Sequence, residues 1–275
     1  MPGRVETLGG VGTGTHPGLR VRLWLPPGYD RGALRYRTLY MMDGQFAFAA
    51  DSEGNNFGAD RRIAKLAAAG RIPPAIIVAV DNSGNARFRQ YLPHAIYERS
   101  SGSLREALDR ELAGQRLVSA QFLRFLADEL KPAIDLRYRT RPGRADTAIA
   151  GASMAGLIAA AALVEEQQAF GRAACISPQW PIYDRSMVDH PQLLPLWPAY
   201  FAGLGAPAGR RLWLDHGTEM IDAGMAPHQA GIVRRLEELG WRRGRDFHAQ
   251  VYRGAGHAFA NTAVQMDDVL SWLLS

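Results

Sequence analysis

The chain has 275 residues, of which 47% are hydrophobic and 21% charged, and its formal net charge is +5. This composition is typical of a soluble globular protein with ample material for a core. The basic residues are scattered, and the densest stretches, 137–144 and 242–245, lie beside proline or glycine. Without a longer basic stripe and interleaved aromatic residues, they indicate solvated loops and argue against a nucleic-acid partner.

A single cysteine, Cys175, excludes an intrachain disulfide, and its apolar neighbours predict a buried, inert thiol. The first six residues lack the charged-then-apolar design of a signal peptide. No apolar run approaches the roughly 20 residues of a membrane span. We therefore expect a cytoplasmic protein with no membrane partner. The sequence leaves the oligomeric state open, a homo-oligomer included.

Short apolar runs alternate with longer helical patterns along the chain. This alternation predicts an α/β protein with a mainly parallel central sheet and helices on both faces. A faint edge strand is expected near residues 5–8. The other predicted strands are, in chain order, 19–25, 38–42, 75–80, 147–150, 173–176, 212–215 and 247–252.

Helical periodicity or composition predicts four helices, at 120–130, 154–164, 227–239 and 258–274. Pro132 is expected to limit the first helix and Gly240 to end the third. No repeat or linker divides the chain, so we expect one domain over residues 1–275. Two segments depart from the alternation and are expected to form long loops that could act as lids or pocket loops, 96–117 and 181–207.

The strongest signal is the segment GASMAGL at 151–157, which joins an apolar predicted strand to an apolar predicted helix. Such a turn must be sharp, and it holds the serine in a strained conformation at the top of the sheet. Gly151 and Ala155 are small, as the close approach of strand and helix requires. Ser153 is therefore the predicted nucleophile of an α/β-hydrolase fold. The amide of Met154, at the helix N-terminus, is expected to face a developing oxyanion.

A serine hydroxyl is a poor nucleophile unless a neighbouring base takes its proton. In the α/β-hydrolase fold the acid and then the histidine follow the serine along the chain. His257 follows a glycine-rich loop directly after the last predicted strand, and it is the predicted base. His248 lies inside a strand pattern and His228 opens a helix, so neither is favoured.

Three carboxylates lie at or after the end of the predicted strand 212–215: Asp215, Glu219 and Asp222. Glu219 comes after the turn at Gly217 and is the predicted triad acid, with Asp222 and Asp215 as open alternatives. His216 and Glu219 are three residues apart beside Asp215, but further His or Cys ligands are not evident. We therefore expect neither a metal nor another cofactor.

Further segments extend the pattern over almost the whole chain. They include LWLPPGY (23–29), YRTLYMMDGQF (36–46), IIVAVDN (76–82), RQYLP (89–93), GTE (217–219) and GH (256–257). Together with the serine turn, these segments resemble the putative esterase family of α/β hydrolases. That family includes enterochelin-type esterases, feruloyl and acetyl-xylan esterases, relatives of S-formylglutathione hydrolase and the mycobacterial mycolyltransferases.

The resemblance implies roles for particular residues. The loop that holds Gln45 supplies the second oxyanion-hole amide in such relatives, so this role is expected of the Gln45 backbone N–H. Their acid lies at the position of Glu219. Candidates for lining the acyl or alcohol pocket, for each of which packing is an equal interpretation, are Phe46, Phe48, Arg89, Trp180 and Tyr183.

The expected function is that of a serine carboxylic-ester hydrolase that acts through an acyl-enzyme on a small or medium ester. One alternative is an acyltransferase, in which a sugar or thiol accepts the acyl group instead of water. Another is a non-catalytic binding module on the same scaffold. The presence of the serine, the histidine and an acid argues against the binding module.

Overall fold

The computed structural model describes residues 3–9 and 19–275. Residues 1–2, which belong to the segment expected to lack a signal peptide, lie outside the described residues. Within the described ranges, no helix is both long and apolar enough to cross a bilayer.

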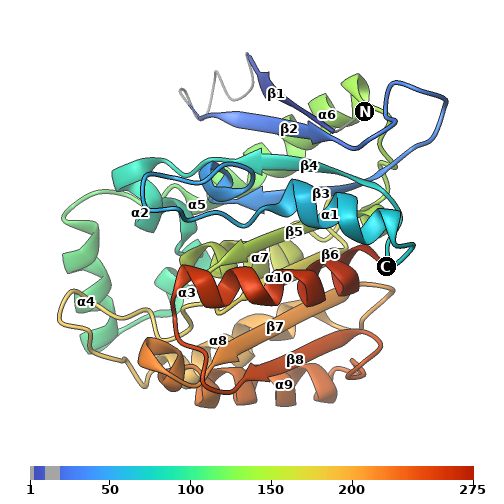
Figure 1. Ribbon diagram of the computed structural model, residues 1–275. Coiled ribbons are helices and arrows are strands. Elements are labelled where there is room, and N and C mark those ends of the chain that lie inside the picture. The colour runs from blue at the N-terminus through green and yellow to red at the C-terminus, as the bar shows by residue number, and fades with distance from the viewer. Residues whose placement is uncertain (1–2, 10–18) are drawn as a thin grey trace.

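An eight-stranded sheet runs through the molecule in the order β1-β2-β4-β3-β5-β6-β7-β8 (Figure 1). β1 and β2 pair antiparallel, and β2 is antiparallel to β4. All other pairings are parallel. The strands are β1 (Arg4–Leu8), β2 (Val21–Leu25), β3 (Arg37–Met42), β4 (Ala75–Val80), β5 (Thr147–Ala152), β6 (Arg172–Ile176), β7 (Arg211–Gly217) and β8 (Phe247–Tyr252).

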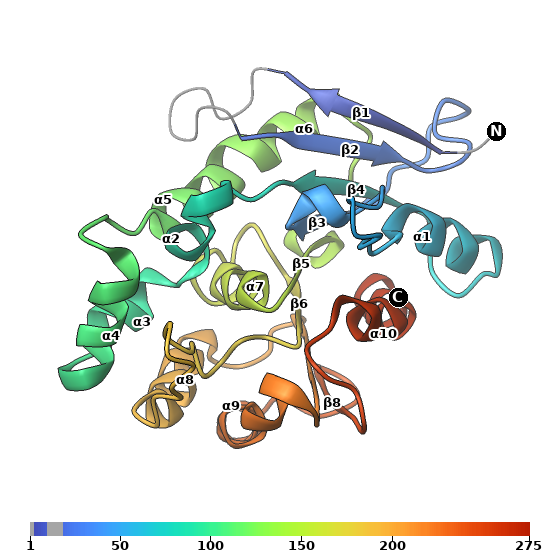
Figure 2. The ribbon, with the colours of Figure 1, turned by 60° about the vertical axis from the view of Figure 1, so that its left-hand side comes forward.

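Helices cover both faces of the sheet (Figure 2). On one face lie α1 (Ala59–Ala68) and α10 (Phe259–Leu274), which pack on each other over one apolar cluster. The larger apolar cluster lies on the other face. The helices that contribute to it are α2 (Arg87–Tyr91), α3 (His94–Arg99), α4 (Gly102–Leu112), α5 (Ser119–Arg124), α6 (Lys131–Arg137), α7 (Met154–Glu165), α8 (Leu193–Phe201) and α9 (Ala226–Glu238).

The predicted parallel sheet with helices on both faces is confirmed. Every predicted strand is present, and the boundaries at 75–80 and 247–252 are correct. The central strands are buried along their whole length, because helices cover both of their sides. Cys175 lies in β6 and is buried, as expected.

Two expectations about local structure are wrong. Pro132 does not end the helix that begins at Ser119: a π-helical stretch follows α5, and α6 then continues through Pro132. Pro132 has no N–H to donate, and the π-helical stretch before it marks where the regular α-helical hydrogen-bond pattern is interrupted. The expected loops at 96–117 and 181–207 contain most of α3, α4 and α8. α3 is short and α8 contains proline, which hides their helical period. α4 is neither short nor proline-containing, and its polar composition was misinterpreted as a loop.

The parallel strands end at a common edge, the left-hand side of Figure 1, where the site residues described below gather. Gly151 near the end of β5 makes a close approach there: a Cβ at this position would lie 2.2 Å from the carbonyl oxygen of Ala155 in α7. Backbone atoms cannot move aside as a flexible side chain can. Gly151 is therefore required for β5 and α7 to pack.

We expect Gly151→Ala to lower the free energy of unfolding by about 1–3 kcal/mol, the usual cost of overpacking. The matched control is Gly143→Ala, because a Cβ there meets no described atom within 4 Å and the backbone φ is −65°. Urea unfolding of both variants checks the prediction. Equal stabilities of the two variants would contradict it.

Candidate active site

The turn between β5 and α7 places Ser153 at the edge of the sheet. Its backbone has φ 59° and ψ −128°, a strained conformation for a residue with a side chain. Its N–H donates to the carbonyl of Ile176 at the end of β6 (2.9 Å). Every residue of α7 from Met154 to Val164 is buried. This packing holds the helix against the sheet and keeps the strained serine in place.

Ser153, His257 and Asp222 lie in one hydrogen-bonded row. The hydroxyl of Ser153 lies 2.8 Å from Nε2 of His257, and Nδ1 of the same ring lies 2.6 Å from Oδ1 of Asp222. A carboxylate accepts only, so Nδ1 carries the ring proton and Nε2 is free to accept the serine proton. His257 lies in the loop between β8 and α10, as the sequence predicts. The arrangement can generate a serine nucleophile.

The carboxylate of Asp222 is fully buried, and it is held by donors on both oxygens. Oδ2 accepts from the N–H of Gly217 (2.8 Å) and from the hydroxyl of Ser177. Burial by itself would raise the pKa of Asp222. The hydrogen bonds from His257, Ser177 and Gly217 outweigh burial and hold this pKa below its usual value. Asp222 is therefore ionised and can accept the hydrogen bond from Nδ1 of His257.

The expectation that Glu219 contacts the histidine is wrong. The backbone N–H groups of Thr218 and Glu219 both donate to the carbonyl of Ala255 (2.8 and 3.0 Å), and both side chains are exposed. The chain then forms a 3-10 turn, Met220–Gly224, which brings Asp222 back beneath His257. The runner-up in the sequence analysis thus takes the position of the acid.

The two predicted oxyanion donors come from two different elements. Met154 is the first residue of α7, and Gln45 lies in the short 3-10 turn η1 (Gly44–Phe46) after β3. Within the described residues, neither backbone N–H donates to a protein acceptor. The N–H of Met154 directly follows the serine at a helix N-terminus and suits a developing oxyanion, and the N–H of Gln45 remains the expected second donor.

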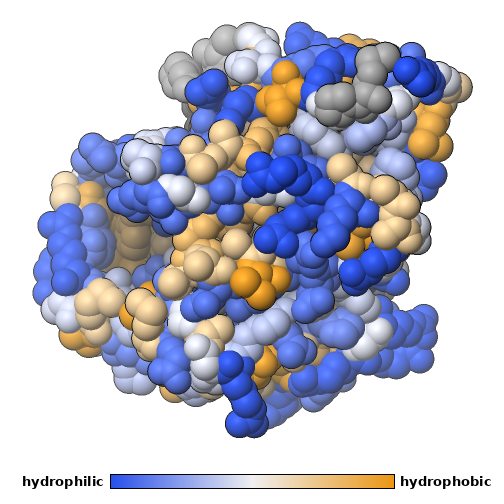
Figure 3. Space-filling model, in the orientation of Figure 1, coloured by the Kyte–Doolittle hydropathy of each residue, from blue (hydrophilic) through white to orange (hydrophobic). Residues whose placement is uncertain are grey.

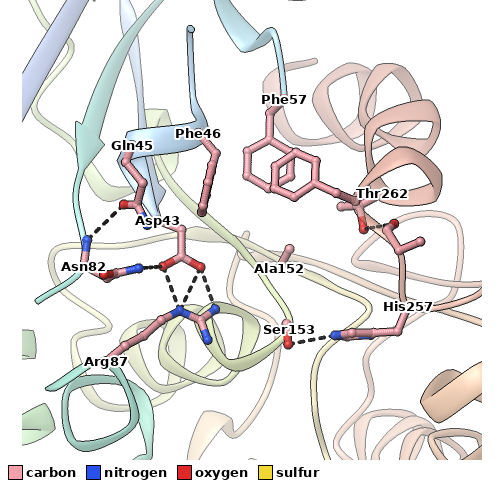
Figure 4. Close-up of a pocket in the computed structure, with 12 residues that line it drawn as sticks. Asp43, Gln45, Phe46, Phe57, Asn82, Arg87, Ala152, Ser153, His257 and Thr262 are labelled. Carbon is pink, nitrogen blue, oxygen red and sulfur yellow. Dashed lines mark hydrogen bonds and ion pairs between the residues drawn. The ribbon is translucent and has the colours of Figure 1, made fainter. Parts of the chain in front are cut away.

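A cavity of about 350 Å³ opens beside Ser153 and His257 (Figure 4). One wall is aromatic: the ring of Phe259 stacks on Phe57 (4.6 Å between centroids) and lies edge-on to Phe46 (5.2 Å). The opposite wall is polar and consists of Asp43, Gln45, Asn82 and Arg87. Phe46, one of the candidate pocket residues, lines this cavity. In the view of Figure 3 the surface is also hollowed and partly apolar between α4 and the edge of the sheet.

Arg89 and Trp180 do not line this cavity. Arg89 is turned away, and its Nη1 donates to the carbonyl of Arg116 (3.2 Å). Trp180 has no exposed surface and packs edge-on against Trp197 (4.8 Å), because α8 covers it. The other two candidates also lie elsewhere: Phe48 is buried in the core, and Tyr183 donates to the carbonyl of Ile221 beside the acid.

Sequence reasoning missed several residues of the cavity. Arg87 precedes the predicted Arg89 by two positions, and Asn82 ends a segment used for the family resemblance. Phe259 follows His257 by two positions, which was the one available signal for it. Nothing in the sequence pointed to Phe57, whose place depends on the long connection between η1 and α1.

No metal centre is present among residues 3–9 and 19–275: no three His, Cys, Asp or Glu side chains there could hold an ion. His216 lies buried in β7, and its Nδ1 is 2.5 Å from the carbonyl of Gly217. The cluster of His216, Asp215 and Glu219 considered in the sequence therefore does not assemble.

The fold and the serine turn define an α/β hydrolase. The sequence model of the family described as "Putative esterase" matches residues 14–265, and the chain therefore belongs to this family. A comparison with curated protein sequences finds no match. Esterase activity is the function that the family membership supports.

Solved structures share the fold at low sequence identity. An IroE-like serine hydrolase from Shewanella oneidensis has a TM-score of 0.69 at 19% identity, over 99% of this chain and 80% of that one. The enterobactin esterase Fes from Shigella flexneri has a TM-score of 0.65 at 17% identity, over 98% of this chain and 59% of that one. A ferulic acid esterase from Anaeromyces mucronatus has a TM-score of 0.63 at 15% identity, over 99% and 89%.

A second buried acid, Asp215, lies beneath the site at the end of β7. Its carboxylate accepts from the N–H of Ser177 (2.7 Å) and from Nε1 of Trp213 (2.6 Å). Burial raises its pKa to about 7, the charge of Asp222 adds to the rise, and the two hydrogen bonds oppose it. Asp215 therefore keeps its proton in the folded protein at a pH where the unfolded chain has lost it.

This raised pKa predicts a pH-dependent contribution to stability. Between about pH 4 and 7 the folded state binds one more proton at Asp215 than the unfolded state, so its stability falls as the pH rises. Asp215→Asn cannot ionise and lacks this dependence. In urea titrations at about pH 4.5 and 7, we expect the free energy of unfolding of the variant, relative to that of wild type, to be higher at pH 7 than at pH 4.5. If the difference in stability between Asp215→Asn and wild type is the same at both pH values, the raised pKa of Asp215 is contradicted.

Proposed function

We propose that the protein is a serine carboxylic-ester hydrolase that acts through an acyl-enzyme. One observation carries the proposal: the hydroxyl of Ser153 lies 2.8 Å from Nε2 of His257, whose Nδ1 faces the ionised Asp222 at 2.6 Å. This is the geometry of a nucleophile, a general base and an orienting acid. The exposed edge of the sheet and the adjoining cavity give a substrate access to it.

The chemistry follows from the positions of these groups. His257 takes the proton of Ser153 as the hydroxyl attacks the ester carbonyl, and the oxyanion that forms accepts from the N–H groups of Met154 and Gln45. His257 then gives the proton to the leaving alcohol, and the acyl group stays on Ser153. A water molecule, activated by the same imidazole, releases the acid. Each step uses groups of the chain, so no cofactor is required.

The cavity indicates where part of the ester binds. Its aromatic wall of Phe46, Phe57 and Phe259 offers an apolar surface beside the nucleophile, and about 350 Å³ suits a small or medium group. The similar solved structures are described as esterases of enterobactin and of ferulic acid. A small-molecule ester is accordingly the proposed substrate, and water the proposed acyl acceptor.

A fluorophosphonate probe tests the nucleophile. We expect stoichiometric labelling of the native protein, hydrolysis of p-nitrophenyl butyrate, and loss of both in Ser153→Ala. Ser177→Ala is a suitable second serine variant, since the hydroxyl of Ser177 donates to Asp222 and not to His257, and this variant should remain labelled. Labelling of Ser153→Ala at the wild-type rate, measured by mass spectrometry, would refute the assignment.

Substitutions of two neighbouring carboxylates, Asp222 and Glu219, test the identity of the triad acid. Asp222→Asn should lower kcat by roughly 10³- to 10⁴-fold, because the amide favours the wrong imidazole tautomer and cannot stabilise the imidazolium. Glu219→Gln removes an exposed charge and should leave kcat within about twofold. Steady-state kinetics on one ester distinguish them. A large loss in Glu219→Gln with little loss in Asp222→Asn would reverse the assignment.

A further inference from the structure

Asp43 is held in an unusual backbone conformation directly after β3. Its φ of 52° and ψ of 46° are left-handed values, which cost a non-glycine residue free energy. Gly44, the next residue, lies so close to β4 that a Cβ would be 2.5 Å from the backbone nitrogen of Val80. Gln45 is the next residue after Gly44, and its N–H is the proposed second oxyanion donor. The direction of that N–H therefore depends on what holds Asp43 and on Arg22, whose Nη2 donates to the carbonyl of Gly44 in the same peptide group (2.6 Å).

The side chain of Asp43 is held by an arginine and an asparagine (Figure 4). Arg87 donates from Nε to Oδ1 (2.9 Å) and from Nη2 to Oδ2 (2.6 Å), which is the paired geometry that gives arginine–carboxylate contacts their strength. Asn82 donates from Nδ2 to Oδ1 (2.7 Å). The Asp43 side chain is only 7% exposed, so solvent screens these contacts weakly.

The same elements also hold the backbone of the turn. The N–H of Asp43 donates to the hydroxyl of Tyr91 (3.0 Å), which is one helical turn after Arg87 on α2. The side-chain oxygen of Gln45 accepts from the backbone N–H of Asn82 (3.2 Å). One helix and one strand end thus fix the turn on both sides of Gly44.

Arg87 lines the cavity beside Ser153, so it could be taken for a residue that binds an anionic substrate group. Its guanidinium, however, is paired with Asp43, and the pair carries no net charge. We propose instead that Arg87 is a positioning residue: through Asp43 it fixes the 43–45 turn so that the N–H of Gln45 faces the oxyanion. The inference rests on the proposed hydrolase function and adds a residue to its machinery.

A double-mutant cycle tests the proposal, with Arg87→Met, Asp43→Asn and the double variant. Asparagine tolerates the left-handed conformation, so Asp43→Asn changes the charge with little change in backbone preference. If Arg87 acts through Asp43, each single variant lowers kcat for p-nitrophenyl butyrate by roughly 10- to 100-fold, within the range known for damaged oxyanion sites. KM should change by less than about threefold, and the double variant should be no slower than the slower single variant.

Arg89→Met is the matched control. Arg89 lies on the same short helix, and its guanidinium donates to the carbonyl of Arg116, outside the cavity. We expect its kcat to stay within about twofold of wild type. Arg87→Lys is the second test variant if Arg87→Met does not fold. Lysine keeps the charge and loses the paired geometry, so its kcat should fall between wild type and the Met variant.

Inhibitor binding separates a positioning role from a general loss of stability. Lower stability would weaken all ligands, whereas a misplaced oxyanion donor weakens only a ligand that forms an oxyanion. A trifluoromethyl ketone forms an oxyanion on the serine, whereas 1-butanol, a neutral alcohol, has neither a carbonyl oxygen nor a charge. Arg87→Met should weaken the ketone by about 10-fold or more and leave 1-butanol nearly unchanged. Equal weakening of both ligands, or wild-type kcat in Arg87→Met and Arg87→Lys, overturns the proposal.

The anion-binding alternative has its own signature. If Arg87 recognised a negative substrate group, the loss in Arg87→Met would be confined to KM for p-nitrophenyl hemisuccinate, and the effects of Arg87→Met and Asp43→Asn would add. That result overturns the positioning role and leaves the hydrolase function intact. A wild-type protein with neither turnover nor fluorophosphonate labelling overturns the hydrolase function, and the inference with it.

Discussion

The geometry of the site depends on the crossing of two loops, one after β7 and one after β8. The carbonyl of Ala255 accepts the N–H groups of Thr218 and Glu219, and this clamp ties the loops together. Gly217 permits the crossing, because a Cβ there would lie 2.0 Å from the same carbonyl oxygen. The clamp turns the side chain of Glu219 outward and lets Asp222 reach His257 from below. The position of Asp222 beside His257 therefore depends on these two backbone hydrogen bonds.

Strained backbone lies on both sides of the cavity and is stabilised in two different ways. Ser153 and Asp43 both have positive φ, a conformation that costs on the order of 1–3 kcal/mol at each residue. The buried helix α7 holds Ser153 by apolar packing. Arg87 and Asn82 hold Asp43 through hydrogen bonds to its carboxylate, and Arg87 adds the attraction of its positive charge. The strain leaves the hydroxyl of Ser153 and the N–H of Gln45 at the same open edge of the sheet.

The errors of the sequence analysis share a physical cause. Arg89 and Arg87 lie on a helix of five residues, which is too short for its periodicity to show which side chain points inward. Trp180 directly precedes the segment 181–207 that was interpreted as a loop, and its burial follows from α8, which proline residues concealed. Glu219 and Asp222 both follow β7 at plausible distances. Only the clamp at Ala255 decides between them.

The sequence by itself determined the alternation of strands and helices, the sharp turn at Ser153 and the location of His257 after the last strand. These features follow from steric rules and apolar periods that act over a few neighbouring residues. The tertiary structure alone decided the partners: Ser153 and His257 are 104 positions apart, and His257 and Asp222 are 35. It also brought Arg87 to Asp43 and Phe57 to Phe259. Contacts over such separations depend on how whole elements pack, and no local pattern encodes that packing.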